Sequence, residues 1–198
     1  MKRLTIIGGG PGGYTAAFAA ARAGMEVTLV ETAHLGGTCL NSGCIPTKTL
    51  KASAEALETA LRLAEFGITC EGTPCVDPAA VLARKEKVAG ILRGGLEKAC
   101  ARLKVRLCMG HGRVLDARHV EVTMAGGSVD VLENDALILA TGSRVAELPG
   151  LAFDHTHILS SDDALQLDRV PRRLVIVGGG VIGCEMAFIY RAFGAQVT

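Results

Sequence analysis

The sequence predicts an α/β fold built from two similar strand–turn–helix units, and a repeated glycine pattern carries this prediction. A G-x-G-x-x-G turn directly follows a short apolar segment near the start of the chain and again 170 residues later. The glycines concerned are Gly8, Gly10 and Gly13 in the first copy and Gly178, Gly180 and Gly183 in the second. Further matches at the same offset pair Gly24 with Gly194, Val27 with Val197 and Thr28 with Thr198. The chain therefore contains a duplicated unit, of which the second copy is only begun.

The spacing of the glycines is typical of a Rossmann-like turn that binds a dinucleotide. The first glycine makes the tight turn, the second lets a pyrophosphate approach the backbone, and the third lets the helix pack on the strand. The phosphates would then accept hydrogen bonds from the N-terminus of the helix. In the first copy the sequence predicts a strand over Leu4–Ile7, a helix over Tyr14–Gly24 and a strand over Glu26–Val30. Glu31 follows Gly13 by 18 positions, where a carboxylate accepts ribose hydroxyls.

The equivalent of Glu31 in the second copy would lie three positions beyond Thr198. Because that position most often separates NAD from NADP, the sequence does not distinguish the two.

The middle of the chain predicts a long helix, a small β-meander and a connecting segment. Asp77 and Pro78 form a helix start, and the helix extends to about Arg102. Core positions on it are Val81, Leu82, Val88, Ile91, Leu92 and Leu96. Strands are expected over 105–108, 113–115, 119–122, 128–132 and 174–177, with a buried strand over 136–140 and a short helix over 161–167. We expect a first domain over 1–150, a linker over 151–171 and the start of a second domain over 172–198.

The charge balance argues against nucleic acid and anionic membrane surfaces as partners. Lys plus Arg number 21 and Asp plus Glu number 20, so the net charge is only +1. The apolar stretch 174–190 is interrupted by glycines and does not predict a membrane span. Hydrophobic residues make up 49% of the chain, which excludes an intrinsically disordered protein.

The seven cysteines do not predict a secreted disulfide framework, because their number is odd and no signal peptide precedes the first strand. We therefore expect a reducing, cytoplasmic protein in which a cysteine pair is catalytic or binds a metal. Cys100, Cys108 and Cys184 are interpreted as small buried hydrophobic residues. Cys70 and Cys75 are interpreted as uninvolved, although two Cys-x4-Cys pairs could make one zinc or iron–sulfur site. The histidines His155 and His157 are interpreted as solvated, and no metal site is assigned.

Cys39 and Cys44 are the strongest candidates for a reactive pair. In an ideal helix, residues five apart have Cα atoms about 8 to 9 Å apart, whereas a disulfide needs roughly 4.4 to 6.8 Å. If the pair bonds, its helix must therefore be distorted, and Gly43 and Pro46 supply the means. Near a helix start, and with Lys48 one turn on, Cys44 is placed for a stabilised thiolate.

Two dinucleotide fingerprints around Gly36–Lys48, which reads GGTCLNSGCIPTK, resemble the FAD-dependent pyridine nucleotide-disulfide oxidoreductases. The resemblance covers the whole chain. Within the family, this segment and Gly10–Tyr14 are most similar to the dihydrolipoyl dehydrogenase branch, although Ser42 stands where the family usually has Val. The resemblance implies a Rossmann-like FAD-binding domain with a small β-meander, followed by the start of a Rossmann-like NAD(P)-binding domain.

The resemblance also implies roles for individual residues. Cys39 would exchange with the substrate, Cys44 would contact the flavin, and Lys48 would pair with Glu185 near the flavin N5. Residues implied in FAD binding are Gly8, Gly10, Gly13, Glu31, Gly36, Gly37, Thr38, Lys48, Gly112, Thr141, Gly142 and Ser143. Residues implied in binding the nicotinamide dinucleotide are Gly178, Gly180, Gly183 and Glu185.

The implied activity passes electrons between a dithiol, a Cys39–Cys44 redox disulfide, FAD and NAD or NADP, in the service of cell redox homeostasis. The implied substrate is a small or protein-bound lipoyl dithiol, the implied assembly is a 2-oxo acid dehydrogenase or glycine cleavage complex, and the full-length protein would be a homodimer. The alternatives are an enzyme like glutathione or mercuric reductase and a non-catalytic flavin-binding fragment. The catalytic His-Glu base of the family is absent from this segment, so we expect the isolated chain to turn over little or not at all.

Overall fold

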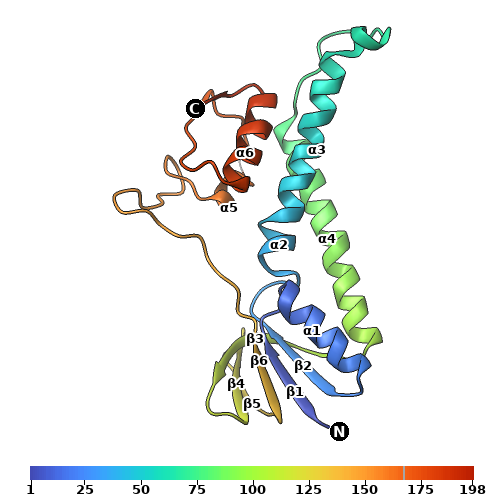
Figure 1. Cartoon of the computed structure of the whole chain (residues 1–198), viewed down its shortest axis with the longest axis vertical. Helices are drawn as coiled ribbons and strands as arrows, with labels where there is room; N and C mark the ends of the chain where they lie inside the picture. Colours follow the sequence, from blue (N-terminus) through green and yellow to red (C-terminus); the bar gives the residue numbers. More distant parts are fainter. Residues whose placement is uncertain (167) are drawn as a thin grey trace. The chain divides into compact units, whose positions relative to one another are not determined.

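The computed structural model describes residues 1–166 and 168–198, and its contacts divide the chain into two compact units (Figure 1). Unit 1 comprises Met1–Asn41 and Gly90–Arg144, and unit 2 comprises Ser42–Ala89 and Val145–Thr198. This division differs from the expected one into 1–150, 151–171 and 172–198, which stays a prediction. No helix among the described residues is long and apolar enough to cross a lipid bilayer.

Unit 1 is built on a six-stranded mixed sheet with the order β5-β4-β3-β2-β1-β6. The strands are β1 (Arg3–Ile7), β2 (Glu26–Glu31), β3 (Arg106–Val114), β4 (His119–Met124), β5 (Val129–Glu133) and β6 (Ala136–Leu139). The strands β1, β2 and β6 are parallel, and the meander β3-β4-β5 is antiparallel. The predicted α/β class and the β-meander are both confirmed.

The first strand–turn–helix unit forms because an apolar strand meets an alanine-rich helix. Helix α1 (Pro11–Arg22) packs Ala17 into the same core as Leu4 and Leu29. Small side chains let this helix approach the sheet closely, and Pro11 occupies the first helical position, where no amide donor is needed. The helix predicted over Tyr14–Gly24 begins three residues earlier and ends two residues earlier, and Gly24, with a φ of +83°, follows its C-cap Ala23.

The prediction of separate strands over 105–108 and 113–115 is wrong, because the single strand β3 runs without a break from Arg106 to Val114. Its first part pairs in parallel with β2 and its second part pairs antiparallel with β4. Gly110 stands at the change of partner, and a Cβ built on it would lie 2.6 Å from the carbonyl oxygen of Thr123. Glycine there lets the two backbones approach, so that the strand continues without a turn.

Strand β6 lies where the sequence predicts a strand, but it is not buried. It forms the edge of the sheet and pairs only with β1 among the described residues. As a result Leu139 is 64% exposed. An apolar run cannot by itself distinguish a central strand from an edge strand, which explains the wrong expectation.

Unit 2 is mainly helical. Its elements are α3 (Cys44–Leu61), the 3-10 helix η1 (Leu63–Phe66), the first half of α4 (Pro78–Arg102), α5 (Ser161–Ala164), β7 (Arg173–Leu174), α6 (Val181–Ala192) and β8 (Gln196–Val197). Its core gathers Leu50, Leu165, Met186, Ile189 and Tyr190. The predicted start of α4 is confirmed, because Asp77 Oδ1 accepts from the amide of Ala80 at 3.1 Å. The helix predicted over 161–167 ends at Ala164, and Leu167 lies outside the described residues.

Three further expectations about burial and extent are wrong. The strand predicted over 174–177 is confined to β7, which pairs with β8, although the amide of Ile176 still donates to the carbonyl of Thr198 at 2.8 Å. On α4, Ile91 and Leu92 are exposed although they were expected in the core.

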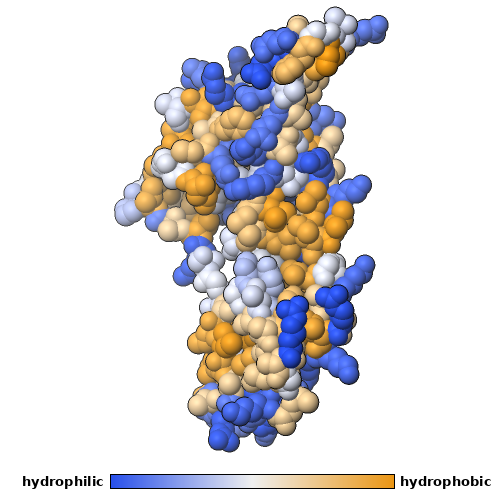
Figure 2. All heavy atoms as spheres, turned by 45° about the vertical axis from the view of Figure 1, so that its right-hand side comes forward, coloured by the Kyte–Doolittle hydropathy of each residue, from blue (hydrophilic) through white to orange (hydrophobic). Residues whose placement is uncertain are grey.

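Apolar side chains reach the surface in both units, as Figure 2 shows in orange.

Candidate functional site

The first glycine turn joins the end of β1 to α1 and leaves no room for a side chain at Gly8 or Gly13. Gly8 has a φ of +106°, and its amide donates to the carbonyl of Val30 at 2.8 Å. A Cβ built on Gly8 would lie 2.1 Å from the carbonyl oxygen of Ala140. A Cβ built on Gly13 would lie 1.7 Å from the carbonyl oxygen of Gly8. The turn and the helix are therefore in direct backbone contact, as the first and third glycines of the fingerprint require.

Gly10 presents the open side of the same turn. It caps α1 in an extended conformation, and no side chain caps the helix. The nearest atom to a Cβ built on Gly10 would be Gly37 Cα at 3.6 Å, so this position has space for a ligand atom. The unpaired amides of the first helical turn and the helix dipole favour an anion there.

Glu31 lies at the end of β2 and faces the glycine turn. Its Oε2 accepts from the amide of Gly9 at 2.7 Å, and its Oε1 accepts from Thr32 Oγ1 at 3.2 Å and from the amide of Ala33 at 3.0 Å. A carboxylate oxygen has two lone pairs, so these contacts leave acceptor capacity for hydroxyl groups. The carboxylate is thus held in place beside the turn by the backbone.

The Gly36–Gly37 turn, also in unit 1, packs against the first glycine turn. Gly36 has a φ of +105° and donates its amide to the carbonyl of Gly9 at 2.8 Å. Gly37 has a φ of +56°, and a Cβ built on it would lie 2.6 Å from Gly10 Cα. The short helix α2 (Gly37–Asn41) follows and carries Thr38 and Cys39.

The remaining predicted residues of unit 1 also lie near the ends of β1 and β2. A Cβ built on Gly112 would be 3.1 Å from Ile7 Cγ2 and 3.3 Å from Val30 Cγ1, so only glycine fits easily. The exposed segment Thr141–Ser143 follows Ala140, whose carbonyl touches Gly8. Unit 1 therefore brings its predicted residues together at the carboxyl ends of the neighbouring strands β1 and β2.

The two candidate redox cysteines lie on two different helices. Cys39 is half-buried in α2, and Cys44 is the exposed first residue of α3. Gly43, with a φ of −145° and a ψ of −114°, is not helical and separates α2 from α3. The expectation that a bonded pair needs a distorted helix stays a prediction. The structure has no disulfide bond between these two sulfurs. The boundary between the units falls between Asn41 and Ser42.

Unit 2 contains the expected pair of Lys48 and Glu185. The Lys48 Nζ lies 2.9 Å from the Glu185 carboxylate and joins α3 to α6. The Lys48 side chain is 56% exposed, whereas that of Glu185 is 19% exposed. The ion pair is present in the structure, and its role in catalysis stays a prediction.

The second glycine turn has the same internal geometry as the first. Gly178 has a φ of +113°, and a Cβ built on Gly183 would lie 2.1 Å from the carbonyl oxygen of Gly178. Gly180 caps α6 in an extended conformation without a side-chain cap. The expectation that Cys184 is buried is wrong: it is exposed, and its Sγ lies 3.4 Å from the carbonyl oxygen of Gly179. It sits in the first turn of α6, where the helix surface is open, whereas Cys100 and Cys108 are buried as predicted.

Two polar residues of unit 1 that were not predicted from the sequence, Asn41 and Arg93, lie beside the Gly36–Gly37 turn. Asn41 Nδ2 donates to the carbonyls of Gly37 at 2.9 Å, Leu35 at 3.1 Å and His34 at 3.5 Å. Its Oδ1 accepts from Arg93 Nη1 of α4 at 3.0 Å. The place of Asn41 between the two cysteines was an available signal. Arg93 offered none, because its partner lies 52 positions away.

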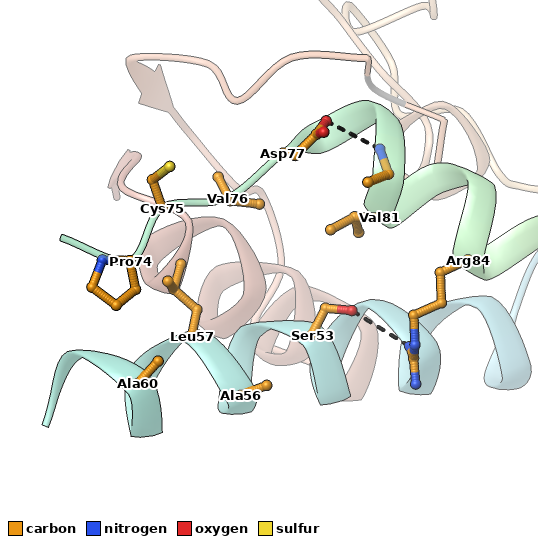
Figure 3. A pocket seen from close by; sticks show the side chains of 11 residues that line it. Ser53, Ala56, Leu57, Ala60, Pro74, Cys75, Val76, Asp77, Val81 and Arg84 are labelled. Atoms are coloured by element: carbon orange, nitrogen blue, oxygen red, sulfur yellow. Dashed lines mark hydrogen bonds between the residues drawn. The ribbon is translucent and has the colours of Figure 1, made fainter. Parts of the chain in front are cut away.

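Figure 3 shows a shallow groove in unit 2 between α3, the segment 74–77 and the start of α4. Its volume is about 380 Å³, and its walls include Leu57, Val81 and the exposed Cys75. Its polar groups are used structurally: Arg84 donates to Ser53 Oγ at 3.4 Å and to a carbonyl of α3. The groove contains none of the predicted site residues, so we assign no chemistry to it.

The linker histidines form two separate pairs with carboxylates. His155 Nδ1 lies 3.0 Å from Asp163, and His157 Nδ1 lies 3.5 Å from Asp154. Three backbone amides, of which that of Ile158 has the largest effect, hold the pKa of Asp154 well below its usual range. Within residues 1–166 and 168–198 no group of three or more His, Cys, Asp or Glu side chains could hold a metal ion.

Comparison with known proteins supports the sequence resemblance. The model of the family described as "Pyridine nucleotide-disulphide oxidoreductase" matches residues 2–198. Similar curated proteins include the mitochondrial dihydrolipoyl dehydrogenase of Dictyostelium discoideum, 40% identical over 100% of this chain and 41% of its own length. The dihydrolipoyl dehydrogenase of Bacillus subtilis is 42% identical over 98% of this chain and 43% of its own length. The chain thus spans about two fifths of the length of these relatives.

Several solved structures share the fold of this chain. LpdA from Mycobacterium tuberculosis matches with a TM-score of 0.92 and 29% identity, over 100% of this chain and 44% of its own. The HOCl-induced flavoprotein disulfide reductase RclA from Escherichia coli matches with a TM-score of 0.81 and 29% identity, over 98% of this chain and 41% of its own.

Proposed function

Because the chain belongs to the pyridine nucleotide-disulphide oxidoreductase family, we propose that it is part of a flavoprotein oxidoreductase. In this proposal the protein passes electrons between a dithiol substrate, the cysteines Cys39 and Cys44, FAD and NAD or NADP. The observation that carries it is the glycine turn of unit 1, whose open side at Gly10 adjoins the turn leading into the Cys39 helix.

The residues of unit 1 fit the adenosine and pyrophosphate parts of FAD. Gly8 and Gly13 let the turn close against α1, and the free space at Gly10 lets a phosphate reach the helix amides. The Glu31 carboxylate would accept the ribose hydroxyls, while its bond from the Gly9 amide keeps it in place. When bound, the flavin would supply the two-electron chemistry that protein side chains cannot perform.

The two cysteines would perform thiol–disulfide exchange. In the oxidised protein, one thiolate of the substrate attacks the Cys39 sulfur, and the bond between Cys39 and Cys44 breaks as Cys44 leaves as a thiolate. The second thiolate of the substrate then attacks the substrate sulfur that is bonded to Cys39. This step forms the substrate disulfide and releases Cys39 as a thiolate. The substrate leaves as a disulfide, and both cysteines hold the two electrons. Cys44 is the first residue of α3.

In unit 2 the proposed roles are electrostatic and positional. Lys48 would present a positive charge to the flavin, and Glu185 would hold the Lys48 ammonium through the observed ion pair. Gly178, Gly180 and Gly183 would bind the pyrophosphate of NAD or NADP at the start of α6.

The proposed substrate is a lipoyl dithiol, free or attached to a protein. Several relatives at 40 to 44% identity are named dihydrolipoyl dehydrogenase, which favours this substrate over glutathione disulfide or mercuric ion. The full-length protein would then act as a homodimer in the cytoplasm and serve a 2-oxo acid dehydrogenase or glycine cleavage complex.

The test is a visible absorption spectrum of the full-length protein before and after addition of dihydrolipoamide. We expect flavin bands and, after reduction, a long-wavelength band that needs the Cys44 thiolate beside the flavin. Cys44→Ser should abolish this band, whereas Cys75→Ser, which removes another exposed thiol of unit 2, should leave it unchanged. Protein without flavin, or a Cys44→Ser variant with full activity, would refute the proposal. Rates with lipoamide, glutathione disulfide and Hg(II) identify the substrate.

A further inference from the structure

Arg93 and Asn41 connect α4 to the glycine turns of unit 1 through a chain of hydrogen bonds. Arg93 Nη1 donates to Asn41 Oδ1 at 3.0 Å. Asn41 Nδ2 in turn donates to the carbonyls of Leu35 and Gly37 at 3.1 and 2.9 Å. The amide of Gly36, between these two carbonyls, donates to Gly9 in the first glycine turn at 2.8 Å.

The chemistry of the amide group fixes its orientation. An amide nitrogen only donates and an amide oxygen only accepts, so a flipped Asn41 would turn its oxygen toward three carbonyl oxygens and its nitrogen toward a guanidinium. The bond from Arg93 carries a charge, is made by half-buried groups, and is therefore among the stronger kinds of hydrogen bond. Arg93 thus holds Asn41 in the one orientation that can bind the Leu35–Gly37 turn.

The position of Asn41 links these hydrogen bonds to the placement of the Cys39 thiol. Asn41 is the last residue of α2, and Cys39 lies two positions before it in the same short helix. A helix of five residues gains little stability from its own hydrogen bonds, so its placement depends on contacts such as these.

We propose that Arg93 and Asn41 are positioning residues that hold the Cys39 helix and the Gly36–Gly37 turn against the dinucleotide-binding turn. This inference rests on the proposed function, because it assigns FAD binding to the first glycine turn. Loss of the Arg93 bond frees Asn41 to rotate, loosens the Gly36–Gly37 turn and exposes Cys39. Neither residue touches the reacting sulfur through the bonds described, and each acts through α2.

The test uses the flavin-loaded, reduced full-length protein with Arg93→Met, Arg93→Lys and Asn41→Asp substitutions. Two quantities are measured: the FAD dissociation constant, and the rate at which iodoacetamide alkylates Cys39, followed by peptide mass spectrometry. For Arg93→Met we expect both to rise about tenfold, as for loss of a charged hydrogen bond. Arg93→Lys keeps a cationic donor and should restore most of the difference. Asn41→Asp keeps the acceptor for Arg93 but places an oxygen against the carbonyls, so it should resemble Arg93→Met.

Arg84→Met is the matched control, since Arg84 also lies on α4 but donates to the Thr49 carbonyl and to Ser53 of α3. It should lower the melting temperature without changing Cys39 alkylation. The inference is overturned if Arg93→Met lowers the melting temperature yet leaves both quantities within about twofold of the wild type, a change below ~0.4 kcal/mol. If the wild type binds no FAD, the proposed function fails, while Cys39 alkylation still tests whether Arg93 and Asn41 hold the Cys39 helix in place.

Discussion

The two G-x-G-x-x-G turns of this chain, at Gly8–Gly13 and Gly178–Gly183, have nearly the same backbone geometry but different surroundings. The first glycines have φ values of +106° and +113°, and the capping glycines Gly10 and Gly180 have φ values of −72° and −74°. In both copies a Cβ on the third glycine would overlap the carbonyl oxygen of the first. The same short pattern therefore builds the same turn in two separate units.

The surroundings of the two turns differ. Gly8 contacts Ala140, Gly9 contacts Leu35 and Glu31, and Gly10 lies against Gly37. In the second copy no described atom would come within 4 Å of a Cβ built on Gly178, Gly179 or Gly180, and Val177 is 69% exposed. The comparison teaches that a fingerprint specifies its own backbone, whereas the walls of a binding site come from distant segments.

The largest expected effect comes from the third glycine of each turn. Gly13→Ala and Gly183→Ala would each force a methyl group onto a carbonyl oxygen, at 1.7 and 2.1 Å. We expect each to lower the free energy of unfolding by roughly 3 kcal/mol, measured by urea denaturation. Gly24→Ala would not test the turn, because Gly24 needs a positive φ and any side chain there would be strained. Equal stability of Gly13→Ala and the wild type would show that the shared turn geometry is not required.

The second prediction separates folding from binding at the capping glycines. Gly10 has a φ that any residue adopts, and an added Cβ would meet only Gly37 Cα at 3.6 Å. Gly10→Ala should therefore change the free energy of unfolding by less than about 0.5 kcal/mol. Because the methyl group fills the space for a phosphate, FAD affinity should fall about tenfold, or ~1.4 kcal/mol. Gly180→Ala should spare FAD and weaken NAD(P)H binding, and titrations followed by fluorescence test both. A wild-type FAD affinity for Gly10→Ala would contradict the assignment of the first turn.

The third prediction concerns the acid sensitivity of the segment that leads to the second turn. Ser160 caps α5, because its Oγ accepts from the amide of Asp163 at 3.2 Å. In return the Oγ and the amide of Ser160 donate to Asp163 Oδ2 at 2.6 and 2.7 Å, and His155 lies 3.0 Å from the same carboxylate. Donation from Ser160 Oγ is the main cause that lowers the pKa of Asp163. Ser160→Ala should cost about 1 kcal/mol at pH 7.

The sign follows from this lowered pKa. A carboxyl group with a lowered pKa contributes its full stability above its ordinary pKa of about 3.9 and loses it as the pH falls through the lower folded value. The difference between wild type and Ser160→Ala should thus persist from pH 7 to about pH 5 and shrink below about pH 4. Urea denaturation at several pH values measures it, and a difference that grows in acid would contradict the mechanism.

The last prediction concerns the ion pair of Lys48 with Glu185, where we also expect only a small effect on stability. Because the Lys48 side chain is more than half exposed, Lys48→Met should lower the free energy of unfolding by less than about 1 kcal/mol. A double-mutant cycle with Glu185→Gln measures the coupling. Lys51→Met, which breaks the ion pair of Lys51 with Glu55 on the same helix, is the matched control. A coupling of several kcal/mol would show that the pair holds α3 to α6 more firmly than its exposure allows.

Much of the fold and part of the site could be predicted from the sequence. The glycine turns, the Ala-rich helix with Gly24 at its end, and the start of α4 at Asp77 all depend on residues within one or two turns of each other. The pair of Lys48 and Glu185 was expected only from the family resemblance. The sequence did not reveal that Cys184 is exposed, because burial depends on what covers a residue and not on its type.

The sequence by itself determined the backbone of both turns, since only glycine lacks the Cβ that would overlap a carbonyl oxygen there. The tertiary structure alone decided that β3 changes partner at Gly110, that Glu31 reaches back to Gly9, and that Arg93 meets Asn41. Each of these contacts joins segments far apart in the chain, and their geometry follows from how the sheet and helices pack.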